Sequence, residues 1–332
     1  MKLELKDKKI LYELDLNSRA TLNEIAKKVG LSKQVVDYHL KNLIKDNVIQ
    51  QFYTVINFSK LGYTQYKLYL KFQNVNPETE KEIIAYWVNN KNSVWVASCR
   101  GRWDLAISIL AKDINNFGEI LSNLINQYGI FILEKDVLIT QISPVFTKAY
   151  LTENKDAQNS KNYGTAFSGK KKFTYGGEIE HYELDDIDKK ILRILSINAR
   201  LTILEMMEKL NLTRDIINYR MKKLTKDNIL SQYRVSINLD KINHKLYKII
   251  LRLHSLTPEK EKQLVTFIAS HPYGTQYLKL VGSWDVELEF GVKDDEHLHE
   301  ILLEIRNQFS EIIRDYDTLL IHQEHKLNYF PF

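Results

Sequence analysis

A chain of 332 residues, 44% of them hydrophobic and 27% charged, has the composition of an ordinary soluble protein with room for several cores. No apolar run approaches the roughly 18 residues of a membrane span, and the first residues lack the apolar stretch of a secretory signal. The single cysteine, Cys99, excludes an internal disulfide framework and any multi-cysteine metal site, so we expect a cytoplasmic protein without a membrane partner.

The first part of the chain contains three helical patterns in about fifty residues. The first pattern covers 6–17, with its apolar residues on one face. A capping box follows, in which Thr21 is the N-cap and Glu24 lies three residues later, and it predicts a short helix as far as Val29. Gly30 then supplies the left-handed backbone that ends a helix before a tight turn. This arrangement indicates a helix-turn-helix head.

A third helix follows the turn, capped by Ser32, and its apolar residues Val36, Leu40 and Leu43 are spaced as one buried stripe. A helix with a packed back and a front of amide, phenol and lysine groups suits the major groove of double-stranded DNA. The alternative is a helical bundle without a nucleic-acid role. Segment 50–57 has the pattern of a strand, either the start of a wing or a linking strand. The polar front consists of Gln34, Tyr38, Lys41 and Lys45, with Lys33 at the end that reaches base edges.

The next ninety or so residues alternate between strand and helix patterns. Such a βαββαβ order is that of a ferredoxin-like domain, whose sheet leaves one face to be covered. The expected strands are 66–72, 94–100, 104–110 and 131–139, and the expected helices are 78–88 and 117–128.

A segment rich in Asn, Ser, Gly and Lys comes next, at 151–185, and its composition is typical of a linker. Its aromatic residues predict that part of it docks on a neighbouring surface. Its basic run, Lys170–Lys172, is interpreted as a solvated turn, with a phosphate contact as the alternative. The aromatic residues are Tyr163, Phe167, Phe173 and Tyr175.

Beyond the linker the whole pattern recurs at a constant offset of 181 residues, so that Arg19 aligns with Arg200 and Trp103 with Trp284. Because these landmarks keep one offset without a gap, the chain is a tandem duplication. We predict an α+β fold in which the two copies cover each other's sheets as an internal pseudo-dimer. Its predicted domains are a first head at 1–59, a first αβ domain at 60–150, the linker at 151–185, a second head at 186–239 and a second αβ domain at 240–332.

Positive charge concentrates in the two heads. The first head has ten basic and seven acidic residues, and the second has eleven and six, which gives net charges of +3 and +5. The αβ domains carry +2 and −4. We therefore expect the heads to face a polyanion, and the second head to hold DNA more firmly than the first.

The heads resemble the Lrp/AsnC family of prokaryotic regulators, on the residues Leu31-Ser32, Val36, His39-Leu40 and Leu43 and their counterparts Leu212-Thr213, Ile217, Arg220-Met221 and Leu224. His39 departs from the arginine usual in the family. The resemblance implies winged helix-turn-helix heads, a sequence-specific transcription regulator and a double-stranded DNA partner. The residues expected to contact DNA are Ser32, Lys33, Gln34, Tyr38, His39, Lys41, Thr213, Arg214, Tyr219, Arg220, Lys222 and Lys223.

The hairpin turns between the middle strands resemble the Gly-x-x-Asp turn of the RAM domain, the amino-acid-sensing half of these regulators. The resemblance implies an amino acid or other small effector near the turns, and pairing of further copies through the αβ domains. The alternative is a purely structural turn, in which Gly takes a positive φ and Asp caps the hairpin. The turn residues are Gly101, Trp103, Asp104, Gly282, Trp284 and Asp285.

Two rival functions stand beside the regulator. Siroheme decarboxylases resemble Lrp/AsnC proteins in both halves and act on a tetrapyrrole, and an architectural DNA binder would sense nothing. We expect a protein that is not an enzyme and that has no cofactor and no metal, because neither His322 and His325 nor His297 and His299 are completed to a ligand set.

Overall fold

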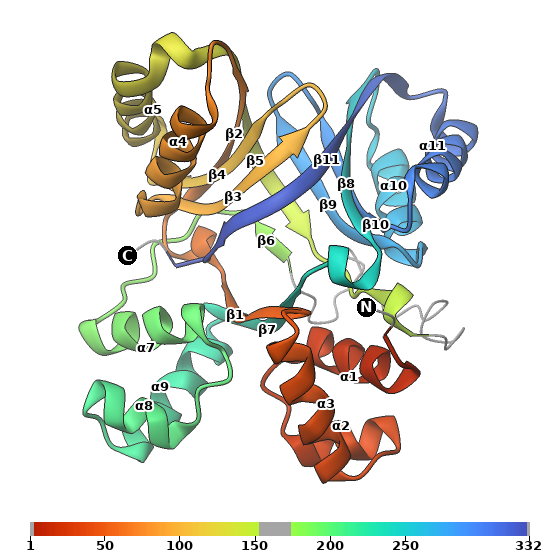
Figure 1. The fold of residues 1–332 in the computed structure, drawn as a ribbon. Coiled ribbons are helices and arrows are strands. Elements are labelled where there is room, and N and C mark those ends of the chain that lie inside the picture. The colour runs from red at the N-terminus through yellow and green to blue at the C-terminus, as the bar shows by residue number, and fades with distance from the viewer. Residues whose placement is uncertain (1–2, 153–173, 331–332) are drawn as a thin grey trace.

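The computed structural model describes residues 3–152 and 174–330. The predicted linker residues Tyr163, Phe167, Phe173 and Lys170–Lys172 lie outside this part of the chain. Figure 1 shows two three-helix heads at one end of the molecule and a strand-rich body at the other. No helix in the described ranges is both long and apolar enough to cross a bilayer.

Each head contains the three helices expected from its sequence. They are α1 (Leu5–Leu16), α2 (Leu22–Val29) and α3 (Lys33–Lys45), and in the copy α7 (Asp186–Ile197), α8 (Ile203–Leu210) and α9 (Arg214–Lys226). The capping boxes at Thr21 and Thr202 both form. Gly30 and Asn211 end the second helices with φ of 69° and 53°, the left-handed conformation that the turn requires.

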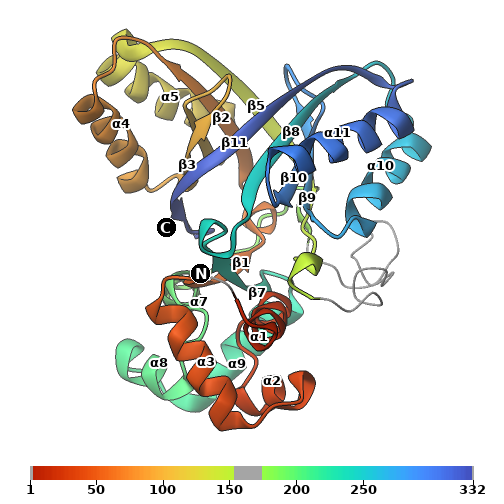
Figure 2. The same cartoon turned by 45° about the vertical axis from the view of Figure 1, so that its right-hand side comes forward.

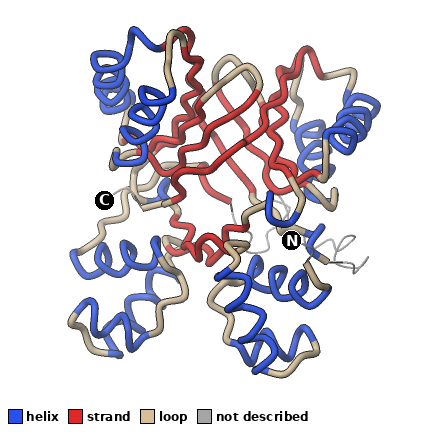
Figure 3. The backbone as a smooth tube through the Cα atoms, viewed as in Figure 1, coloured by secondary structure: helices blue, strands red, loops and turns tan. Residues whose placement is uncertain are grey.

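The strand that follows each head links the two heads. Strands β1 (Ile49–Ile56) and β7 (Leu230–Ile237) pair with each other as an antiparallel ribbon, with Phe52 opposite Val235. Each strand also packs on the other head, since Ile56 belongs to the core of the second head and Val235 to that of the first. Of the two alternatives left by the sequence, the linking strand is the one observed. Figure 3 shows this ribbon between the helices and the body.

Both αβ units have the predicted ferredoxin-like topology, with sheet orders β5-β2-β4-β3 and β11-β8-β10-β9. Their short 3-10 helices are Phe58–Lys60, Gly129–Phe131, Ala149–Leu151 and Asp240–Ile242. The first unit comprises β2 (Thr64–Phe72), α4 (Pro77–Asn89), β3 (Ser93–Arg100), β4 (Leu105–Ala111), α5 (Ile114–Tyr128) and β5 (Ile132–Pro144). The second comprises β8 (Lys245–Leu253), α10 (Pro258–Ser270), β9 (Gly274–Val281), β10 (Val286–Val292), α11 (Asp295–Phe309) and β11 (Ile313–Leu327).

The last strand of each unit is longer than predicted, because it joins both sheets. Strand β5 pairs with β2 of its own unit and then with β9, and β11 pairs with β8 and then with β3. The eight strands therefore form a closed ring with the helices outside it (Figures 1 and 2). The inner faces share one core, which contains Trp103 of the first unit and Trp284 of the second. The copies cover each other's sheets, as the sequence predicted.

Part of the linker docks on this ring. Strand β6 (Thr174–Gly176) pairs with the end of β5, and Tyr175 is buried against Phe58. The expectation of a docked aromatic residue is confirmed for Tyr175.

Candidate nucleic-acid interface and central cavity

The third helices of the heads present matching polar faces to solvent. Their buried stripes are those predicted, except that Met221 is only half-buried. Tyr38 and Tyr219, at equivalent positions on α3 and α9, are each 64% exposed, an unusual exposure for a large aromatic side chain. The residues of the predicted DNA contact that lie exposed are Ser32, Lys33, Gln34, Tyr38, Lys41, Thr213, Arg214, Tyr219, Lys222 and Lys223.

Two of the predicted contact residues are held inside their heads. His39 Nδ1 lies 2.7 Å from a carboxylate oxygen of Asp7, and its side chain is 12% exposed. Arg220 Nη1 lies 2.5 Å from Asp185 and 3.4 Å from Asp188. Both positions therefore tie the recognition helix to the first helix of the same head. A DNA contact by His39 or Arg220 stays a prediction.

The heads are fixed to each other by reciprocal hydrogen bonds that the sequence reasoning missed. Arg19 Nη1 donates to the carbonyls of Ala199 and Leu201 at 2.5 and 2.9 Å. Arg200 Nη1 donates to the carbonyls of Ser18 and Ala20 at 2.5 and 3.0 Å. Such exchange of equivalent contacts is the pattern of a two-fold dimer interface. The sequence contained one indication of this contact, because Arg19 and Arg200 occupy equivalent positions in the two copies.

The two Gly-x-x-Asp turns form close contacts with the opposite unit. Gly101 has φ of 129°, and a Cβ there would lie 2.9 Å from the carbonyl oxygen of Thr318. Gly282 has φ of 151° and packs equally closely against Val137. The carboxylates of Asp104 and Asp285 accept hydrogen bonds from the backbone amides of Phe72 and Leu253, both at 2.7 Å. These contacts match the structural alternative, while effector binding at the turns stays a prediction.

At the junction between the ring and the heads, one side contains two buried charged residues and one half-buried lysine. Asp15 of α1 is completely buried and lies 2.9 Å from Arg234 of β7 and 2.8 Å from Lys148. Burial alone would raise the pKa of Asp15, but Arg234 and Lys148 outweigh it and hold the pKa below its usual value. The residues at the same repeat positions on the other side are Ser196, Tyr53 and Tyr329. The charged triad therefore occurs once.

Within the ring, one glutamate forms ion pairs with two lysines at equivalent repeat positions. Lys67 and Lys248 occupy the same repeat position, and both bind Glu287, at 2.5 and 2.6 Å. Tyr69 donates a further hydrogen bond to Glu287, and Lys248 also bonds to Glu289. Burial lowers the pKa of Lys67 to about 8, whereas the two carboxylates outweigh burial at Lys248 and raise its pKa. These opposite shifts distinguish two residues that the duplication made equivalent.

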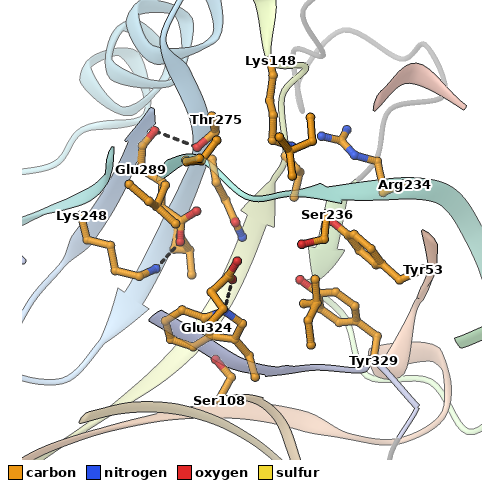
Figure 4. Close-up of a pocket in the computed structure, with 18 of the residues that line it drawn as sticks. Tyr53, Ser108, Lys148, Arg234, Ser236, Lys248, Thr275, Glu289, Glu324 and Tyr329 are labelled. Atoms are coloured by element: carbon orange, nitrogen blue, oxygen red, sulfur yellow. Dashed lines mark hydrogen bonds and ion pairs between the residues drawn. The ribbon is translucent and has the colours of Figure 1, made fainter. Parts of the chain in front are cut away.

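A cavity of about 120 Å³, lined by several charged side chains, lies between the ring and the ribbon. In Figure 4, Lys148 enters it from the top, Glu324 from below, and Lys248 and Glu289 from the left. None of the six turn residues lines this cavity. An adjoining hollow of about 330 Å³ shares Ile237, Leu239, Leu246 and Glu324 with it.

The remaining candidate groups are Cys99 and the paired histidines. Cys99 is buried, which raises the pKa of its thiol to about 12 and makes it a poor nucleophile. His322 and His325 contact Arg100 and Ser98 respectively. Within residues 3–152 and 174–330, no three metal-ligating side chains are grouped.

Comparison with known proteins gives relatives of each unit and a fold match for the whole chain. The family described as winged helix-turn-helix DNA-binding matches residues 3–50 and 184–231. An uncharacterized HTH-type transcriptional regulator of Pyrococcus horikoshii is 32% identical over 130 residues, which are 38% of this chain and 86% of the relative. That relative therefore corresponds to about one unit of the duplication.

Among solved structures, the siroheme decarboxylase NirDL matches over 98% of this chain and 94% of its own, with a TM-score of 0.62 and 12% identity. At that identity the likeness concerns the fold alone. An AsnC family transcriptional regulator from Agrobacterium tumefaciens matches 44% of this chain and 94% of its own, with a TM-score of 0.40 and 21% identity.

Proposed function

This chain belongs to the Lrp/AsnC family of HTH-type transcriptional regulators, and we propose that it is a sequence-specific DNA-binding regulator whose two heads enter major grooves of one duplex. The observation that carries the proposal is the pair of matching exposed faces on α3 and α9, on heads that are fixed to each other. A fixed pair of recognition helices reads two half-sites at a set spacing, typically about 34 Å apart.

The two half-sites differ in sequence. Gln34 and Asp215 occupy the same position on the two recognition helices, and both are exposed. An amide reads adenine by paired hydrogen bonds, whereas a carboxylate accepts from the amine of cytosine. The operator is therefore an imperfect palindrome, with one half-site read by each head.

In this proposal the αβ domains respond to a small effector, and the family resemblance suggests that the effector is an amino acid. A ligand that binds one packing of the ring better than another changes how the attached heads are held, and so changes affinity for DNA. Light scattering with and without DNA distinguishes a single chain acting as an internal pseudo-dimer from an assembly of further copies.

The test begins with a genome-wide footprint, followed by binding of the purified chain to a footprinted duplex and to a scrambled one. We expect tighter binding to the footprinted site, and an affinity that falls steeply with salt. The double variant Lys41→Ala/Lys222→Ala should lower the salt slope by about 2, one for each phosphate contact. Lys262→Ala, an exposed lysine on α10, is the matched control. Absence of binding at low salt contradicts the proposal, and equal affinity for both duplexes supports an architectural binder instead.

A tetrapyrrole enzyme is the second candidate, favoured by the full-length fold likeness to siroheme decarboxylase. We propose that this chain is not such an enzyme. The cavity of about 120 Å³ is below the roughly 300 Å³ at which ligand pockets begin, so it would have to widen into the adjoining hollow of about 330 Å³ to admit a macrocycle. A visible absorption band in the purified protein, or carbon dioxide release from added siroheme, would reverse this proposal.

A further inference from the structure

The central cavity has one positively charged end. Arg234 and Lys148 share a single carboxylate, that of Asp15, so this end carries one positive charge in excess. At the opposite end Lys67 and Lys248 face Glu287 and Glu289, and Glu324 is a further carboxyl of the lining. An uncompensated charge in a buried place is costly unless a partner neutralises it.

Polar atoms around the cavity also lack partners. Arg234 is 2% exposed, and its Nε has no hydrogen-bond partner within the described part of the chain. The same holds for the hydroxyl of Tyr150 and for Oε1 of Gln65. All three residues line the cavity. Buried polar groups are normally satisfied, so unpaired atoms on three residues that line the cavity favour a polar occupant.

The other walls of the cavity indicate the size of the bound molecule and its second polar group. Glu324 points into the cavity from below (Figure 4), and its Oε1 accepts from the indole N–H of Trp95 at 2.6 Å. Burial raises the pKa of Glu324, and a ligand hydroxyl can pair with its carboxyl in either protonation state. A cavity of roughly 150 Å³ admits a benzene ring, so about 120 Å³ suits about six non-hydrogen atoms.

We propose that this cavity binds one small organic monocarboxylate of about six non-hydrogen atoms, with its carboxylate at Arg234 and Lys148 and a hydroxyl or keto oxygen toward Glu324. The pseudo-symmetric position across the junction has Tyr53 and Tyr329 in place of the two cations, so the site has no counterpart at the equivalent repeat positions. The adjoining hollow shares four lining residues with this cavity.

Calorimetry on the full-length protein without DNA tests this site, so its outcome is separate from whether the heads bind DNA. The probes are L-lactate and pyruvate, each compared with its amide, and alanine and inorganic phosphate as other charge types. We expect one equivalent of lactate or pyruvate per chain. The amides should bind at least about tenfold more weakly, because they lose a charged hydrogen bond.

Two variants locate the bound probe. Arg234→Lys keeps a charge beside Asp15 but removes Nε, and it should weaken binding about tenfold or more. Glu324→Ala removes the polar group at the opposite end and should weaken binding, whereas Glu296→Ala, exposed on α11, is the control that leaves binding unchanged. Thermal melting verifies that each variant is folded.

The proposal is overturned if neither carboxylate binds, if the amides bind equally well, if two equivalents bind, or if alanine or phosphate binds where the carboxylates do not. Unchanged binding by the folded Arg234→Lys variant, or by Glu324→Ala should Arg234→Lys fail to fold, also overturns it.

Discussion

The two sides of the junction between heads and ring occupy equivalent repeat positions but differ in chemistry. On one side Asp15, Arg234 and Lys148 form a buried charged triad. On the other side Ser196 replaces the aspartate, and Tyr53 and Tyr329 stack with ring centroids 6.0 Å apart. In a homodimer both sides would have the same residues. Fusion of two copies in one chain lets one side be ionic and the other aromatic.

This difference revises the expected inequality of the heads. The first head's charge of +3 includes Asp15, and the second head's charge of +5 includes Arg234. Both residues point inward and pair with each other, with Asp15 at 0% and Arg234 at 2% exposure. Without them each head presents +4. The difference in net charge between the heads is therefore buried, and it gives no reason for the second head to bind DNA more firmly.

The largest expected effect comes from removing the aspartate. Asp15→Ser installs the residue of the other side and leaves Arg234 and Lys148 buried without their carboxylate. We expect a loss of about 3–5 kcal/mol in the free energy of unfolding, measured by urea titration. Asp186→Ser removes a 92% exposed aspartate of α7 and should cost less than about 1 kcal/mol. Equal losses would show that the triad contributes no more than a surface charge.

The same aspartate predicts a pH dependence. Because the pKa of Asp15 is lower in the folded protein than its ordinary 3.8, the unfolded chain takes up the proton first. Its contribution is therefore present above pH 3.8 and is lost as the pH falls through the lower, folded value. The gap in urea midpoint between the parent and Asp15→Ser should narrow below that pH. A constant gap would place the cost of the substitution in packing rather than charge.

Local structure in both heads was predictable from the sequence. Helix ends fell within a few residues of expectation because capping boxes and the positive φ of Gly30 and Asn211 are encoded by adjacent residues. The ferredoxin-like order was predictable from alternating patterns. The closed ring was not, because the pairing of β5 and β11 with the opposite unit depends on partners far away in sequence.

The buried charges could not be predicted for the same reason. Asp15 lies on an amphipathic helix, where an aspartate normally faces solvent, and its partners Lys148 and Arg234 are 133 and 219 residues away. One signal was present in the sequence. All three positions of the triad change character between the copies, while neighbouring landmarks such as Asn17 and Arg19 are retained.

The arginine exchange offers a symmetric counterpart to the triad. Arg19→Gln and Arg200→Gln each remove two hydrogen bonds from a guanidinium to carbonyls of the other head. We expect each to lower the free energy of unfolding by about 1.5–3 kcal/mol, and the two losses to agree closely, because the contacts are equivalent. Urea titration of both variants in parallel measures this. Unequal losses would mean that the asymmetry of the junction extends into the contact between the heads.

Making the two sides alike tests whether the triad is needed for stability. The variant Asp15→Ser/Lys148→Tyr/Arg234→Tyr gives the charged side the residues of the aromatic side. Replacing a complete buried ionic cluster is often nearly neutral. We therefore expect the free energy of unfolding of the triple variant to lie within roughly 2 kcal/mol of the parent value, and well above the value for Asp15→Ser alone. A triple variant as unstable as Asp15→Ser would mean that the two sides are not interchangeable in shape.

The smallest expected effect is the difference between the heads in binding DNA. Lys41→Ala and Lys222→Ala each remove one exposed lysine from equivalent positions, and each should lower the salt slope by about 1. Lys41 also pairs with Asp37 at 2.6 Å, but an exposed pair of this kind is worth only about 0–1 kcal/mol and leaves the lysine available to phosphate. With +4 at each surface, the two affinity losses should agree. A consistently larger loss from Lys222→Ala, measured on one footprinted duplex at several salt concentrations, would restore the stronger second head and locate its origin in the recognition helix rather than in total charge.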